Sequence, residues 1–198
     1  MDKFCYLGSI ITKDGGADED VANRIQKARI AFGSLHRVWS SKRLTRRLKL
    51  QIFNSNIKPV LLYGCETWKV TNNITCRIQV FVNRCLRKIT GIFYPNTITN
   101  ENLWQITNQQ RVCVEIGKRK WGWIGHTLRK NENDITKQAM SWNPPGKRRA
   151  GRQFSTWRRT VEKEAKQQQK VWSELSSLAT NKVRWSCFID ALRFIEEQ

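Results

Sequence analysis

The stretch Pro59-Val60-Leu61-Leu62-Tyr63-Gly64-Cys65-Glu66-Thr67-Trp68 joins two runs of helical periodicity and decides how they meet. Pro59 has no N–H and crowds the preceding turn, so it ends or kinks the helix expected over 45–62. Gly64 enters left-handed conformations at little cost, which makes it the expected break. Tyr63 and Trp68 each bring a large apolar face and one polar atom, and Glu66 between them needs a partner if it is buried. We therefore expect a tight, aromatic-filled corner with a structural role.

The composition indicates a folded, strongly basic chain. It has 198 residues, enough for one large domain or two small ones, and 39% of them are hydrophobic, including nine Trp and eight Phe. Lys and Arg number 36 against 16 Asp and Glu, which gives a formal net charge of +20. Such an excess predicts a polyanionic partner, and nucleic acid is the commonest one, although a ribosome-like structural role would suit the charge too. Composition does not distinguish RNA, DNA or a hybrid.

Several classes of site and location are not expected. No apolar run approaches the roughly 20 residues of a membrane span, so we expect no membrane partner. The start at Met1 lacks the apolar core of a signal peptide, and we expect a nuclear or cytoplasmic, not a secreted, protein. The six cysteines are spread singly, and His126 has no second histidine or suitably spaced cysteine beside it. We therefore expect no metal site and no cofactor.

Hydrophobic periodicity predicts a succession of helices after a short β element at Phe4–Ile11. A first helix is expected over 18–39 and a second over 45–62. A third helix over 73–90 carries the broadest apolar face and is the expected central core helix. A long helix over 109–128 and a final pair over 171–179 and 181–195 follow. The predicted fold class is all-α with a short N-terminal β element.

Five motifs, in this order along the chain, resemble the C-terminal part of the reverse transcriptases of LINE-type (non-LTR) retrotransposons. They are F-x-Y-L-G-x-x-I at 4–11, P-x-L-x-Y-G-x-E-x-W at 59–68, R-x-x-x-W-x-G-H-x-x-R at 119–129, G-K-R-x-x-G-R at 146–152 and W-x-x-L-x-x-L-A-x-N-x-x-x-W at 172–185. Gln153 stands where this family usually has proline. The resemblance implies a structural role for Trp121, Gly125 and His126 in the third motif.

The resemblance also implies a domain organisation. Residues 1–16 would form a primer-grip-like strand and turn around Tyr6, Leu7 and Gly8, although an ordinary hairpin edge explains the same residues. Residues 17–142 would form a thumb-like helical domain. A basic linker over 143–154 would lead to a smaller C-terminal helical region over 155–198.

Three basic clusters are the predicted nucleic-acid-binding sites. Pro144, Pro145 and Gly146 keep the linker out of helices, so its guanidinium groups are free to reach phosphates. A nuclear-localisation signal explains the same linker charges. The second cluster lies at the start of the 45–62 helix, where positive charge opposes the helix dipole. A bound anion would relieve this cost, but a solvated basic face explains the same residues. The predicted residues are Lys147, Arg148, Arg149, Arg152, Trp157, Arg158 and Arg159; Arg43, Arg46 and Arg47; and Arg119 and Lys120.

The polymerase centre of that family has no counterpart here. Its chemistry needs paired aspartates that hold two metal ions, and the sequence has no Y-x-D-D-like string. We therefore predict a truncated, nucleic-acid-binding fragment that is inactive alone, with the missing palm and fingers of the polymerase as a further partner. Two alternatives stay open: the tail of a longer, active RNA-directed DNA polymerase, and a degenerate retrotransposon-derived protein with no selected function.

Overall fold

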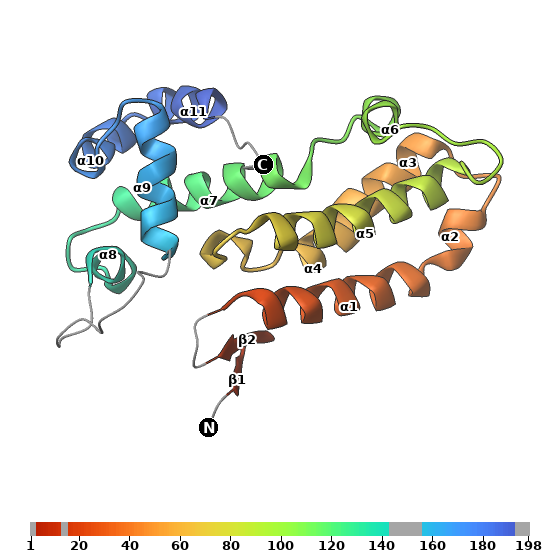
Figure 1. The fold of residues 1–198 in the computed structure, drawn as a ribbon, viewed down its shortest axis with the longest axis horizontal. Coiled ribbons are helices and arrows are strands. Elements are labelled where there is room, and N and C mark those ends of the chain that lie inside the picture. The colour runs from red at the N-terminus through yellow and green to blue at the C-terminus, as the bar shows by residue number, and fades with distance from the viewer. Residues whose placement is uncertain (1–2, 13–15, 143–155, 193–198) are drawn as a thin grey trace. The chain divides into compact units, whose positions relative to one another are not determined.

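The computed structural model describes residues 3–12, 16–142 and 156–192. The described chain divides into two compact units, one up to Glu115 and one from Ile116 onward. This division falls inside one helix, α7 (Val112–Leu128). The predicted basic linker lies outside the described residues. Apart from one two-stranded sheet the described elements are helices, which confirms the predicted fold class (Figure 1).

The first unit begins with an antiparallel hairpin of β1 (Lys3–Tyr6) and β2 (Ser9–Thr12), in which Tyr6 pairs with Ser9. Leu7 and Gly8 form the two-residue turn and have φ values of 48° and 78°. Positive φ at both central residues is what a type I′ hairpin turn requires. The short β element is thus a closed hairpin at the N-terminal end of the described chain.

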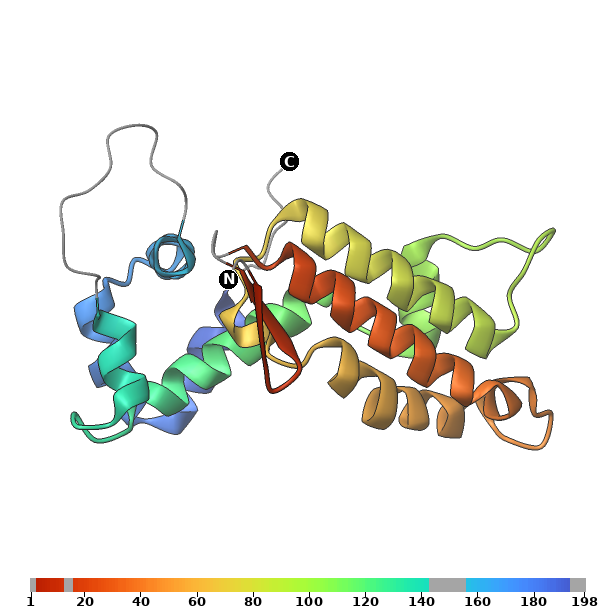
Figure 2. The same ribbon diagram turned by 90° about the horizontal axis from the view of Figure 1, so that it is seen from below.

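Three helical segments form the body of the first unit. α1 (Asp18–Ser34) and α5 (Asn72–Thr90) run side by side in the same direction, and the segment between them runs back in the opposite direction (Figures 1 and 2). That segment contains α3 (Arg46–Ile52), a π-helical turn (Phe53–Ile57) and α4 (Lys58–Leu61). A short α2 (His36–Ser40) links α1 to α3, and α6 (Asn100–Thr107) follows α5.

Two of the predicted helices are interrupted. The helix expected over 18–39 breaks at Leu35, whose ψ of 20° is not helical, and Trp39 then folds back so that its indole donates to the Phe32 carbonyl. In the 45–62 segment the π turn interrupts the helix before Pro59, and Pro59 itself lies in the first turn of α4, where its missing N–H costs little. Leu48 on α3 is 40% exposed.

α5 is the core helix of the first unit, as predicted. Thr71 caps its N-terminus by accepting from the Ile74 amide, and Gly91 ends it with a φ of 72°. It packs against α1, α2, α3 and α6. The buried residues are Ile74, Ile78, Phe81, Val82, Cys85, Leu86 and Ile89 on α5, and Val21, Ala28, Phe53, Ile57, Leu61 and Leu103 around it.

The second unit packs helices around an aromatic centre on α7. Its other helices are α8 (Ile135–Ser141), α9 (Trp157–Gln167), α10 (Trp172–Thr180) and α11 (Lys182–Ala191). Asp134, Thr156 and Asn181 cap α8, α9 and α11. Trp121 lies fully buried against Trp185 and Phe188, so α7 and α11 share one hydrophobic core.

Candidate nucleic-acid interface

The corner at 59–68 is built around a buried polar network. Gly64 has a φ of 73°, a conformation that favours glycine, and Trp68 is only 3% exposed. The Trp68 indole donates to Asp20 Oδ2 at 2.9 Å, and Asp20 Oδ1 accepts from the Ile10 amide at 3.0 Å. One carboxylate therefore joins the corner, the start of α1 and the hairpin.

Arg24 completes this network. It is buried beside Asp20, donates to Ser9 Oγ at 2.7 Å and lies 4.3 Å from the ring centre of Tyr63. Asp20 and Arg24 are charged residues that helical periodicity does not place in the core, yet both are buried. Glu66 also makes an interaction. The corner is occupied by intramolecular contacts, whereas Tyr63 remains 48% exposed.

The hairpin tip is exposed but tethered. Leu7 is 71% exposed and Tyr6 58%. The Gly8 carbonyl accepts from Lys27 Nζ at 3.0 Å and from Asn23 Nδ2 at 3.3 Å, so α1 holds the turn in place. The tip could present apolar side chains to a partner, but its backbone carbonyl is already bonded.

Two of the predicted phosphate-binding residues lie on α7, and one of them is buried. Lys120 is 3% exposed and its ammonium lies 2.5 Å from Glu164 Oε1, while Trp121 Nε1 donates to Glu164 Oε2 at 2.6 Å. Lys120 is thus buried and ion-paired, and in this structure its ammonium does not face solvent. Arg119 is half-buried and makes an interaction of its own.

The predicted binding residues at the start of α9 also contact other side chains of the same unit. Trp157 is half-buried, and its ring meets Trp123 edge to face at 6.0 Å. Arg158 pairs with Glu162 at 3.1 Å and lies over the Trp172 ring. Arg159 makes an interaction too. Their predicted partners in the linker, Lys147, Arg148, Arg149 and Arg152, lie outside the described residues.

His126 is exposed, and Gly125 beside it is buried against Trp185. In the described part of the chain no group of three or more His, Cys, Asp and Glu side chains could hold a metal ion. No helix among the described residues is both long and apolar enough to cross a membrane.

The cluster before and at the start of α3 is the predicted site that the structure leaves open to solvent. Arg43, Arg46 and Arg47 are all exposed, and none forms an ion pair within the described ranges. Arg46 and Arg47 also edge a hollow of about 710 Å³ whose other walls carry the amide side chains of Asn54 and Gln109. These side chains suit contacts with phosphates and other polar groups. The helix that carries Arg46 and Arg47, α3, is only seven residues long.

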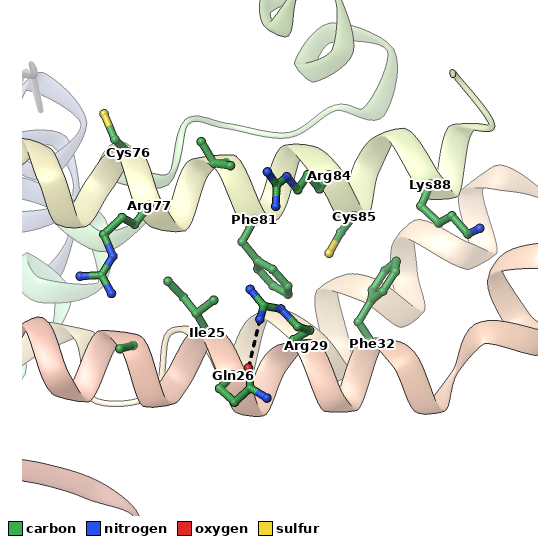
Figure 3. A pocket seen from close by; sticks show the side chains of 12 residues that line it. Ile25, Gln26, Arg29, Phe32, Cys76, Arg77, Phe81, Arg84, Cys85 and Lys88 are labelled. Atoms are coloured by element: carbon green, nitrogen blue, oxygen red, sulfur yellow. Dashed lines mark hydrogen bonds between the residues drawn. The ribbon is translucent and has the colours of Figure 1, made fainter. Parts of the chain in front are cut away.

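A second basic surface, which the sequence analysis did not single out, lines a groove between α1 and α5 (Figure 3). The groove has a volume of about 730 Å³. Its floor is apolar, with Ile25, Phe32 and Phe81 pointing between the two helices. Its rim carries four cations: Arg29 from α1 and Arg77, Arg84 and Lys88 from α5.

The cations on this rim are mostly unneutralised. Arg77 lies 3.5 Å from Asp18, and Arg29 donates to Gln26 at 3.2 Å, a neutral partner. Arg84 and Lys88 are exposed and have no acidic side chain within ion-pair distance among the described residues. The α5 cations recur at helical spacing beside the apolar stripe. This spacing is a sequence signal from which the basic surface could have been predicted.

Two cysteines of α5 report on the groove because they differ in environment. Cys76 is exposed and lines the groove. Cys85 forms part of the floor, and burial raises the pKa of its thiol to about 12. Cys85 therefore stays protonated near neutral pH, which disfavours thiolate chemistry there.

Comparisons with known proteins point to a mobile-element background. A domain family of unknown function, DUF6451, matches residues 31–63, from the end of α1 into the corner. F52C9.6, an uncharacterized transposon-derived protein of Caenorhabditis elegans, is 24% identical to this chain over 197 residues, which cover 96% of this chain and 70% of that protein. No solved structure matches. The similarity over nearly the whole chain indicates a transposon-related origin.

Proposed function

We propose that this chain derives from the C-terminal region of a LINE-type reverse transcriptase and binds nucleic acid without catalysing polymerisation by itself. The ordered series of motifs supports the specific origin, and the similarity to a transposon-derived protein supports the broader one. The net charge of +20 supports a polyanionic ligand.

The observation that carries the proposal is the groove between α1 and α5. Phosphates need cations, and Arg84 and Lys88 offer two that no described acidic group neutralises. The faces of bases need apolar or aromatic surface, which the groove floor offers between its cationic edges. Binding of a strand there would release condensed counterions, which favours association at low salt.

Cysteine footprinting tests this location. Cys76 lines the groove and is exposed, and Cys187, on α11 in the other unit, is exposed too. We expect a saturating oligonucleotide to slow alkylation of Cys76 by a neutral reagent and to leave the rate at Cys187 unchanged. Mass spectrometry of the digested protein measures both rates in the same sample.

The matched control for general shielding is Cys187 itself. Raising the salt concentration should dissociate the oligonucleotide and restore the rate at Cys76. If the oligonucleotide binds while Cys76 reacts as fast as in the free protein, the groove is not the interface. The exposed cluster of Arg43, Arg46 and Arg47 or the basic linker would then be the next surface to test.

A further inference from the structure

A smaller hollow adjoins the C-terminal end of the groove, where the loop after α5 folds against the helix. Its volume is about 390 Å³. Arg84 and Lys88 line both this hollow and the larger groove, so the two are neighbours. The loop adds Phe93 and Tyr94 to the wall, and Asn96 and Thr97 beside them.

The aromatic side chains of this loop are unusually open to solvent. Tyr94 is 91% exposed and Phe93 54%. One face of Phe93 meets Lys88, whose ammonium lies 5.6 Å from the ring centre. Tyr94 makes no ring contact among the described residues, so its ring is free to stack on a ligand. An exposed tyrosine pairs apolar surface with a polar tip, a combination enriched at binding sites.

The charges around the hollow are all of one sign. Arg84, Arg87 and Lys88 line it, and no acidic side chain does so within the described chain. Arg87 donates to the Ile98 carbonyl at 3.3 Å and to Asn100 Oδ1 at 2.8 Å, so it holds the loop against α5. Arg84 and Lys88 are left to meet an anion. The amide of Asn96 and the hydroxyl of Thr97 add hydrogen-bonding groups that a base edge can use.

We propose that this hollow binds one unpaired nucleotide of an RNA or DNA strand, an inference that rests on the proposed nucleic-acid function. The base stacks on Tyr94, and its phosphate meets Arg84 and Lys88. A base inside a duplex already has both faces covered by its neighbours and cannot stack on a side chain. The hollow therefore gives the chain a preference for single-stranded over double-stranded nucleic acid.

Replacing Tyr94 tests the stacking contact directly. Fluorescence anisotropy would measure binding of oligo-dT, oligo-U and a DNA duplex of the same length to the parental chain and to Tyr94→Ala. We expect Tyr94→Ala to weaken single-strand binding about tenfold, within the range measured for one base stacked on one aromatic ring. Duplex binding should not change, and Tyr94→Phe should bind like the parent because it keeps the ring. Comparison of oligo-dT with oligo-U shows whether the site prefers the deoxythymidine or the uridine strand, and oligo-dU separates the effect of the sugar from that of the base methyl group.

Trp142→Ala provides an aromatic control in the other unit, because Trp142 is also exposed, at 65%. It should leave all three affinities unchanged. If Tyr94→Ala binds single strands as well as the parent does, while Arg84→Ala with Lys88→Ala binds them less well, the nucleotide site is refuted and the proposed function stands. If Tyr94→Ala weakens single-strand and duplex binding equally, the site is refuted too. If the parent binds no nucleic acid, both proposals fall.

Discussion

Replacing Gly125 with alanine tests how α7 packs on α11 in the second unit. A Cβ built at Gly125 would lie 2.0 Å from Trp185 Nε1, 2.5 Å from Cε2 and 2.6 Å from Cδ1. The indole has little room to move, because Trp185 is 3% exposed and packs on Trp121 and Phe188. Trp185 Nε1 also donates to the Trp121 carbonyl at 3.0 Å. The methyl group therefore has to displace a buried, hydrogen-bonded ring.

The expected cost follows from these contacts. Overpacking a core by one methyl group costs about 1–3 kcal/mol, and a buried hydrogen bond that is lost leaves an unsatisfied group worth about 1–3 kcal/mol. Alanine regains about 1 kcal/mol over glycine in a helix interior. We expect Gly125→Ala to lower the free energy of unfolding by about 1–5 kcal/mol.

Gly122 supplies the matched control, since it lies in the same helix and a Cβ there would meet nothing within 4 Å. Gly122→Ala should stabilise the protein by up to about 1 kcal/mol through helix propensity alone. Urea unfolding followed by tryptophan fluorescence and far-ultraviolet circular dichroism would measure both variants. A Gly125→Ala variant as stable as Gly122→Ala would refute the described packing. In a Trp185→Ala background the Gly125→Ala change should cost little, because the clash is gone.

Further predictions concern the two cores and the groove floor. Trp68→Ala should lower the free energy of unfolding by about 3–5 kcal/mol because it removes a buried ring and leaves Asp20 without its indole donor, and a parental urea midpoint would contradict this. Lys120→Met should cost about 3–5 kcal/mol in the same assay, since it leaves Glu164 with a poorly compensated charge; an unchanged stability would mean that the ion pair is dispensable. Cys85 should resist alkylation near neutral pH until the chain unfolds, because its pKa is about 12, and rapid labelling of the native protein would show that the groove floor is open.

Local sequence signals anticipated the elements that depend on local chemistry. The apolar face of α5, its Thr71 cap and its Gly91 terminus follow from helical periodicity and from the few residues that suit helix ends. Gly64 was expected to break the chain and has a positive φ. In each case the deciding interaction lies within a few residues of the position it fixes.

Interactions between residues far apart in sequence were not foreseen. Arg24 and Lys120 fall on positions that a periodicity argument assigns to solvent, yet both are buried because a distant partner compensates their charge or hydrogen bonds. Lys120 finds its partner 44 residues away, in Glu164. The break at Leu35 is more local, since Trp39 donates its indole N–H to the Phe32 carbonyl seven residues earlier. The groove was not predicted because it forms only where α1 and α5 pack together. The sequence of either helix alone does not indicate it.

The central claim is that the groove between α1 and α5 binds nucleic acid through its cations. The most direct test is the affinity of the parental chain for an oligonucleotide across a series of salt concentrations, compared with the Arg84→Ala, Lys88→Ala double variant. Each phosphate contact adds roughly 0.7–0.9 to the slope of log K against log salt, so the double variant should have a slope smaller by about 1.4–1.8. A Lys147→Ala, Arg148→Ala, Arg149→Ala variant of the basic linker serves as the comparison. Salt-independent binding, or a slope that only the linker variant changes, would contradict the claim.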